Sequence, residues 1–231
     1  AEIKPFLFLK LTTSDNLEGW GEAFTLPARE IGIVEIIHDL MTTVSSLENL
    51  SPEIFHTKAN QIADGHRGID FSAATSAIEM SLWDIKAKQE DKPLSHLLSK
   101  NPKKKVSVYA NTWSEKLPNC EALTIRAIDL LSKGYGGIKI YPLQNRSIEE
   151  AVSCISKLRN KIGLETPLML DLASPQDPKI SLKLASLIKE FKPYWFEEPI
   201  APEDLDGYRE LRAGLKVNIS GGEAEFNRWG W

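Results

Sequence analysis

The stretch "PYWFEEPIAP", residues 193–202, is the part of the sequence that decides the fold. It runs from aromatic side chains into two adjacent acids, Glu197 and Glu198, and then meets Pro199. Such a run is typical of a short buried strand that stops at the proline. Because an unpaired charge is costly to bury, acids at the end of a buried strand indicate that a cation lies close to them.

Two further acids stand at matching places in the neighbouring strand-like runs. Asp171 lies near the end of "PLMLDLA" (167–173), and Glu223 ends "VNISGGE" (217–223). Each is 26 residues from Glu197, which is the length of one strand–helix unit. The spacing therefore predicts three acids at the carboxyl ends of three consecutive parallel strands, the end at which α/β barrels form their active sites.

Three carboxylates at one rim repel each other unless a divalent cation lies among them. Oxygen ligands with open positions suit Mg²⁺, so we expect Mg²⁺ on Asp171, Glu197 and Glu223. The alternative is that each acid caps a helix or pairs with an arginine. Strand alternation turns Glu198 to the opposite face, where a structural hydrogen bond or salt bridge is the expected role.

One unit earlier, the run "GIKIYP" (137–142) carries Lys139 and Tyr141 on one face of a strand. A lysine near a bound carboxylate can neutralise developing negative charge. The tyrosine can transfer protons if Lys139 and the metal lower its pKa from about 10. The alternative is that Lys139 only pairs with one of the acids and that Tyr141 packs.

The sequence pattern changes close to residue 100. Residues 1–100 predict an α+β domain that starts with a hairpin and continues with helices. The ranges are 5–13 and 19–24 for strands, and 30–47, 52–64, 72–90 and 91–100 for helices, with Ser72 as the expected cap of the helix 72–90. Residues 101–231 predict alternating strands and helices around a parallel sheet; the strands are 106–111, 137–142, 167–173, 194–199 and 217–223, and the helices are 118–133, 146–162, 178–191 and 203–213.

Composition excludes several classes of function. The net charge of −4 gives no basic field for nucleic acid, and no apolar run approaches the roughly 20 residues that span a membrane. The two cysteines, Cys120 and Cys154, lie on predicted helices without a CxxC partner, so we expect free thiols in a reducing cytoplasm.

With these residues in view, the chain resembles the enolase superfamily, in its mandelate racemase and muconate lactonizing enzyme branch. The motifs that carry the resemblance are "LEGWGEAF" (17–24), "SAIEMSLWDIKAKQEDKPLSHLL" (76–98), "LMLDLA" (168–173), "WFEEPIAPEDLDGYREL" (195–211) and "ISGGEAEFNRWGW" (219–231). The last of them looks most like the sugar-acid dehydratases of the family. The resemblance covers nearly the whole chain.

The resemblance implies a capping α+β domain followed by a TIM-like (β/α)₇β barrel. It implies Mg²⁺ on the three acids, a substrate carboxylate held by the metal and Lys139, and removal of the proton α to that carboxylate to form an enediolate. The cap would close over the site through residues 24–31, with Phe24 and Arg29 as substrate-binding residues. The expected reaction is dehydration of a sugar acid.

Three departures from the family pattern matter. The family commonly carries Lys-x-Lys where this chain has Lys139 and Tyr141, and Asp-x-Asn where it has Asp171 and Ala173. The chain also stops eight residues after Glu223, and five strands cannot close an eight-stranded barrel. We therefore expect a fragment, or the traceable part, of a longer polypeptide whose barrel is present only through its fifth strand.

Other functions stay open on the same residues. A racemase, epimerase or cycloisomerase would use the same metal site on another carboxylate substrate, such as a different 2-hydroxy acid. A non-catalytic homologue or an inactive fragment would keep the metal site without the chemistry. We expect the full-length protein to form a homo-oligomer.

Overall fold

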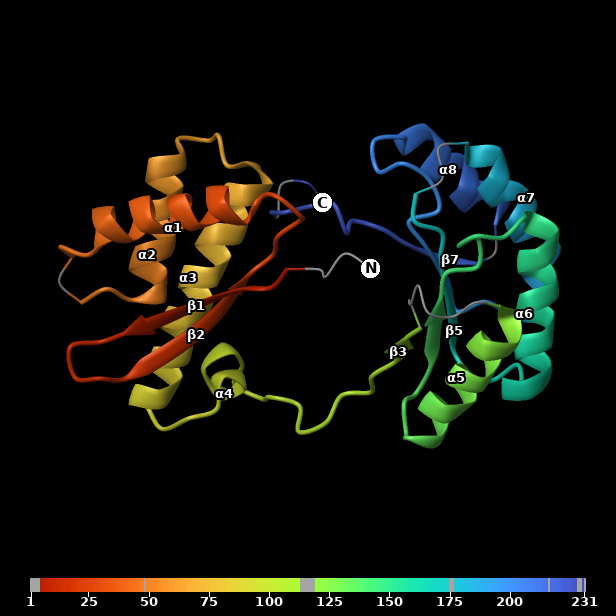
Figure 1. The fold of residues 1–231 in the computed structure, drawn as a ribbon, viewed down its shortest axis with the longest axis horizontal. Helices are drawn as coiled ribbons and strands as arrows, with labels where there is room; N and C mark the ends of the chain where they lie inside the picture. Colours follow the sequence, from red (N-terminus) through yellow and green to blue (C-terminus); the bar gives the residue numbers. More distant parts are fainter. Residues whose placement is uncertain are drawn as a thin grey trace. The chain divides into compact units, whose positions relative to one another are not determined.

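The computed structural model describes residues 5–47, 49–112, 119–174, 177–215, 217–227 and 230. The chain divides into two compact units, Ala1–Lys104 with Phe226–Trp231, and Lys105–Glu225. Figure 1 shows both units and labels many of their elements. The predicted domain boundary between residues 100 and 101 stays a prediction. Pro118, where one predicted helix starts, and Arg228, Trp229 and Trp231 of the last motif lie outside the described residues.

The first unit contains an antiparallel hairpin and four helices. The predicted hairpin is confirmed, since Leu7 is in register with Ala23 and Thr12 with Glu18. The elements are β1 (Leu7–Thr12), β2 (Glu18–Ala23), α1 (Glu30–Val44), α2 (Pro52–Ala63), α3 (Gly68–Gln89) and α4 (Leu94–Leu98).

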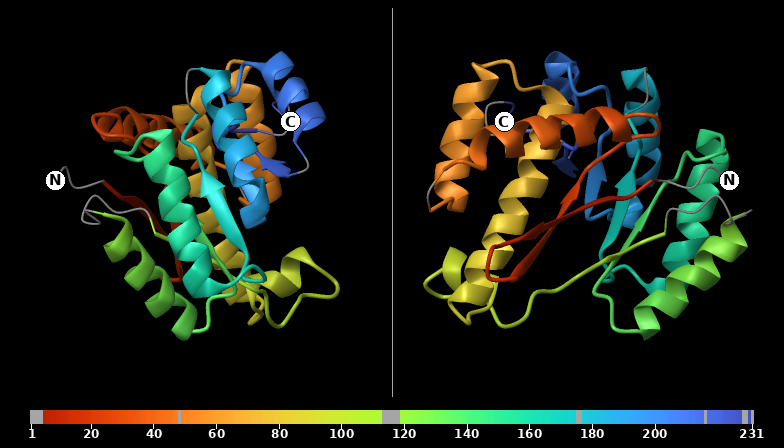
Figure 2. Two further views of the ribbon diagram at one scale, coloured as in Figure 1. Left: turned by 90° about the vertical axis from the view of Figure 1, so that its right-hand side faces the viewer. Right: turned by 60° about the vertical axis from the view of Figure 1, so that its left-hand side comes forward.

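The hairpin of this unit lies along α3, as the right-hand view of Figure 2 shows. Alternate β2 residues Gly19, Gly21 and Ala23 are buried against that helix. α3 begins at Gly68, four residues before the predicted start, so the expected cap by Ser72 is wrong. Although α3 is the longest helix of the described residues, neither it nor any other described helix is long and apolar enough to cross a membrane.

The second unit is a parallel sheet with strands in the order β3-β4-β5-β6-β7. The predicted strands are all present, although each is shorter than predicted. The strands are β3 (Ala110–Asn111), β4 (Ile138–Ile140), β5 (Leu168–Asp171), β6 (Trp195–Glu197) and β7 (Asn218–Ser220). The connecting helices are α5 (Cys120–Ser132), α6 (Ile148–Ile162), α7 (Pro178–Ile188) with the 3₁₀ turn η1 (Lys189–Phe191), and α8 (Leu205–Gly214).

Helices α5, α6 and α7 lie along one face of this sheet (Figure 1). Their apolar sides and the strand residues between them, such as Ile138, Leu168 and Phe196, form one buried core. A capping box of Ser147 and Glu150 fixes the start of α6. Among the described residues β3 and β7 are the edge strands, so these five strands form a partial α/β barrel.

The prediction about the two cysteines of this unit is wrong. Cys120 and Cys154 are not free thiols but form a disulfide that joins α5 to α6, with a Cα–Cα distance of 5.4 Å. The two helices follow neighbouring parallel strands and therefore pack side by side on one face of the sheet. That packing brings together two cysteines 34 residues apart in sequence, which local patterns do not reveal.

Candidate active site

The first two acids lie at the carboxyl ends of neighbouring strands. Asp171 is the last residue of β5, Glu197 is the last residue of β6, and the two are in direct register. Asp171 is buried, and its Oδ1 accepts the backbone N–H of Ala173 at 3.0 Å, which anchors the loop that follows β5. The matching position at the carboxyl ends of neighbouring strands, which the sequence spacing predicts, is thus confirmed for Asp171 and Glu197.

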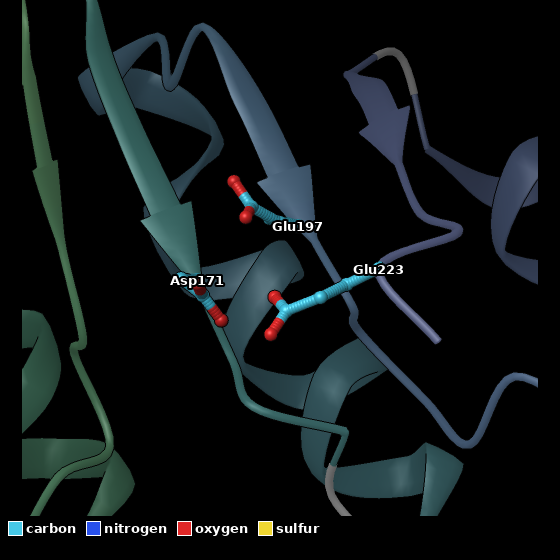
Figure 3. A group of neighbouring side chains, drawn as sticks. All are labelled: Asp171, Glu197 and Glu223. Atoms are coloured by element: carbon cyan, nitrogen blue, oxygen red, sulfur yellow. The ribbon is translucent and has the colours of Figure 1, made fainter. Parts of the chain in front are cut away.

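The third acid is held differently. Ser220, the last residue of β7, is the register partner of Glu197, and Glu223 follows three residues later in a turn. The prediction that Glu223 ends its strand is therefore wrong. Its side chain reaches back from the turn toward the other two acids, as Figure 3 shows.

The three carboxylates converge nonetheless. Asp171, Glu197 and Glu223 each offer one oxygen atom, and these three atoms lie within 4.8 Å of one another. In Figure 3 the three side chains point toward a common space from β5, β6 and the turn after β7. The sequence prediction that the acids share one location is confirmed, while their role as ligands stays a prediction.

Lys139 lies beside the acids. Its Nζ is 2.5 Å from Glu197 Oε1 and 3.1 Å from Asp171 Oδ2, and the side chain is buried. Burial lowers the pKa of Lys139, but the hydrogen bonds and charges of Glu197 and Asp171 outweigh burial, and the net shift is upward. Lys139 is therefore a permanent cation next to the acid cluster.

Tyr141 follows two residues later on the same face of the chain. Lys139 Nζ lies 5.8 Å from the centre of its ring, and Asn111 Nδ2 donates to its hydroxyl at 3.4 Å. Burial is the largest effect and raises the pKa of Tyr141, and the charge of Asp171 and a hydrogen bond to it also raise this pKa; the Asn111 hydrogen bond and the Lys139 charge lower it, and the net shift is upward. The expected lowering of this pKa is thus not what the protein alone produces, and the phenol keeps its proton at neutral pH.

Trp195 is a site residue that the sequence analysis did not identify. Its indole Nε1 donates to Glu197 Oε2 at 3.0 Å, so both oxygens of Glu197 are held by donors. The ring also packs edge-on against Tyr109, with ring centres 5.5 Å apart. The signal was present in the sequence, since alternation by two places Trp195 on the same face of β6 as Glu197.

The donor set fits a hard divalent cation. All the donors are carboxylate oxygens, which Mg²⁺ prefers, and the three oxygens lie within 4.8 Å of one another, close enough that one ion could sit among them. The three acids and Lys139 leave two negative charges uncompensated, which one divalent cation would neutralise. Asp171, Glu197 and Glu223 could therefore hold the ion.

The predicted substrate-binding residues Phe24 and Arg29 belong to the first unit. The Phe24 side chain is about half exposed, at 52%. Arg29 is exposed and forms an ion pair with Asp70 at 3.1 Å. The acid cluster belongs to the second unit, and the contact of Phe24 and Arg29 with substrate stays a prediction.

Two family models match the chain. Residues 2–99 match the model described as the mandelate racemase / muconate lactonizing enzyme N-terminal domain. Residues 123–231 match the model described as enolase C-terminal domain-like. Together the two models cover both the cap and the partial barrel.

Several relatives support the same assignment. The D-gluconate dehydratase of Thermoproteus tenax is 25% identical over 228 residues, which cover 94% of this chain and 45% of the dehydratase. A crystal structure of an enolase from the environmental genome shotgun sequencing of the Sargasso Sea is 41% identical, with a TM-score of 0.90 over 95% of this chain and 58% of that chain. The structure of the 3,6-anhydro-D-galactonate cycloisomerase from Zobellia galactanivorans is 31% identical, with a TM-score of 0.85 over 97% of this chain and 62% of that chain.

The chain thus spans about half of the length of the relatives it matches. The cap, the parallel sheet and the order of the motifs agree with both family models. The chain therefore belongs to the enolase superfamily, in its mandelate racemase / muconate lactonizing enzyme branch.

Proposed function

We propose that the complete protein removes the proton α to the carboxylate of a sugar acid in a Mg²⁺-dependent reaction and then eliminates water. The observation that carries the proposal is the convergence of Asp171, Glu197 and Glu223 beside the buried cation Lys139. A proton α to a carboxylate is very weakly acidic. Its removal therefore needs positive charge that is already in place where the enediolate forms.

The roles of the residues follow from their positions. The three acids would hold Mg²⁺, which when bound supplies Lewis-acid stabilisation of negative charge on the substrate carboxylate. Lys139 stays charged and sits in a buried position, so it can orient that carboxylate and stabilise the second negative charge that deprotonation creates.

Tyr141 is suited to donating a proton. Its raised pKa keeps the phenol neutral, and the Asn111 hydrogen bond to its hydroxyl orients it. In dehydration a base takes the C2 proton, the C3 hydroxyl takes a proton from an acid and leaves as water, and the resulting enol becomes a 2-keto acid. We assign to Tyr141 the delivery of a proton in this sequence.

Dehydration is preferred because curated relatives that match over most of this chain include dehydratases of sugar acids. The D-gluconate dehydratase of Thermoproteus tenax is one of them. Cycloisomerisation is the second candidate, because the Zobellia galactanivorans structure at 31% identity is a cycloisomerase. Both reactions begin with the same proton abstraction, so the metal site alone does not separate them.

The test is a library of sugar acids incubated with the protein and MgCl₂ in D₂O, followed by proton NMR and a colorimetric assay for 2-keto acids. Dehydration predicts loss of substrate with formation of a 2-keto acid. Cycloisomerisation or epimerisation predicts a product without loss of water. If the complete protein neither exchanges the α-proton of any acid nor converts any acid to product, the enzyme proposal is contradicted and a non-catalytic homologue is favoured. Chelator-treated protein and Glu197→Gln are the negative controls.

A further inference from the structure

We propose that Glu198 is a positioning residue that holds the turn after β7 so that the carboxylate of Glu223 meets those of Asp171 and Glu197. The inference rests on the proposed metal site for its consequence, but on the geometry of the metal-free protein for its argument. Glu223 lies three residues beyond the end of its strand, so β-sheet pairing does not fix it. Something else must hold this turn in place.

The Glu198 side chain makes the contacts that do so. Its Oε1 accepts the backbone N–H groups of Gly222 at 2.7 Å and of Glu223 at 3.1 Å. Two consecutive amides that donate to one carboxylate oxygen fix the path of the turn at the residue that carries the proposed ligand. Charge-assisted hydrogen bonds of this kind are stronger than those between neutral groups.

The other polar atoms of Glu198 form hydrogen bonds with the loop after β5 and with the end of β7. Its Oε2 accepts the Ser174 hydroxyl at 3.2 Å, and its carbonyl oxygen accepts the Ser174 N–H at 2.8 Å, in the loop that follows Asp171. Its own N–H donates to Ser220 O, at the end of β7, at 2.9 Å. Glu198 thus connects the loop that follows the first proposed ligand to the turn that carries the third.

Burial, backbone conformation and a neighbouring tyrosine all restrict the position of the Glu198 carboxylate. Glu198 is only 5% exposed, its φ of 40° is left-handed, and Tyr208 of α8 hydrogen bonds to its side chain. A non-glycine residue with that φ is uncommon and persists only where its surroundings hold it. A Cβ at Gly221 would lie 3.2 Å from the Tyr208 hydroxyl, so a glycine there lets the turn approach closely.

The experiment compares Glu198→Ala with Glu198→Gln. The glutamine side-chain oxygen can still accept both amides, whereas alanine leaves them without an acceptor. In the metal-free protein, we expect amide exchange at Gly222 and Glu223, measured by NMR, to be faster by about tenfold or more in Glu198→Ala than in Glu198→Gln. Because supporting groups around a metal typically change its affinity by about 10–100-fold, Mn²⁺ affinity by EPR should fall by at least about tenfold in Glu198→Ala and by much less in Glu198→Gln.

Two control variants separate positioning from other effects. Glu190→Ala removes an exposed acid, so it tests the loss of charge alone. Ser181→Ala removes a buried hydrogen bond to Pro199 O in the same unit, so it should lower the melting temperature without changing Mn²⁺ affinity.

The outcomes decide between the two proposals. Wild-type amide protection and Mn²⁺ affinity that persist in Glu198→Ala would overturn the role of Glu198 and leave the metal site standing. Equal losses in Glu198→Gln and Glu198→Ala would also overturn it, because the acceptor geometry would then not matter. Protected amides that depend on residue 198, in a protein that binds no Mn²⁺, would support the role of Glu198 and reject the proposed function.

Discussion

Glu197 is held on both carboxylate oxygens by donors. Lys139 Nζ donates to Oε1 and Trp195 Nε1 donates to Oε2. This arrangement orients the carboxylate before any ion binds. It also makes replacement of Glu197 by glutamine unfavourable, because the amide nitrogen of glutamine is a donor that would have to face one of the two other donors.

Glu197→Gln should therefore lose metal affinity by more than the removal of one charge implies. We expect Mn²⁺ affinity, measured by EPR or calorimetry, to fall by at least about tenfold, together with a loss of about 1–3 kcal/mol in stability from the mismatched donors. Glu190→Gln, an exposed acid changed in the same way, is the control. Unchanged affinity in Glu197→Gln would remove this residue from the set of ligands.

Tyr141 gives the second prediction at this scale. Because its raised pKa keeps the phenol protonated, Tyr141→Phe removes a proton donor but little volume. Turnover should fall by about 10²–10⁴-fold if the phenol delivers the proton, while Mn²⁺ affinity stays close to that of the wild type. Tyr135→Phe is the matched control, since that tyrosine is partly exposed. Turnover that survives in Tyr141→Phe would show that the side chain only packs.

At the scale of elements, β2 and α3 form the closest contact of the cap. Every second residue of β2 faces α3: Gly19 lies against Ser81 and Ile85 of the helix, and Gly21 lies against Ala77 and Ser81. The backbone of the strand therefore rests almost directly on the helix. The segment "LEGWGEAF" that marks the family in the sequence is thus a packing motif.

Gly21→Ala should destabilise the cap strongly. A Cβ at this position falls on the carbonyl oxygen of Ala77 and lies 2.8 Å from Ser81 Oγ, so strand and helix must separate. We expect a loss of at least about 2–3 kcal/mol in urea unfolding. Gly32→Ala in α1 is the control, since its Cβ meets nothing within 4 Å and alanine is the better helix former, worth up to about 1 kcal/mol. A Gly21→Ala protein as stable as the wild type would contradict this packing.

The same scale shows why the sequence predicted part of the site and missed the rest. Asp171 and Glu197 end neighbouring strands in register, so a spacing read from the chain translates directly into position. Glu223 shares the spacing but not the register, since it lies in a turn whose backbone N–H groups at Gly222 and Glu223 donate to Glu198 Oε1. Outside the site, the sequence analysis also did not identify Arg159, whose buried guanidinium donates to four backbone carbonyls that only the folded chain brings together.

At the scale of the whole molecule, the chain supplies a cap and the first five strands of a barrel-type sheet. The three clustered acids, Asp171, Glu197 and Glu223, all lie at the ends of these strands or in the turn that follows them. The predicted homo-oligomer and the cytoplasmic location stay predictions. The sequence analysis expected free thiols at Cys120 and Cys154, whereas the structure has a disulfide there, and this bond affects the second unit as a whole.

The Cys120–Cys154 disulfide should stabilise the second unit by restricting its unfolded state. It closes a loop with a sequence separation of 34, for which the chain-entropy model gives about 3–4 kcal/mol. Reduction of the wild type should therefore lower the urea midpoint of this unit, because the unfolded chain regains the freedom that the bond removes.

The matched control is the double variant Cys120→Ala/Cys154→Ala, which cannot form the bond and should unfold at the same urea concentration with or without reductant. Intact mass before and after alkylation counts the free thiols of the wild type directly. A wild-type protein that takes up two alkyl groups without prior reduction would show that the thiols are free. An equal midpoint in both redox states would show that the bond, where it forms, does not restrict the unfolded chain, and that the packing of α5 against α6 stabilises the unit without it.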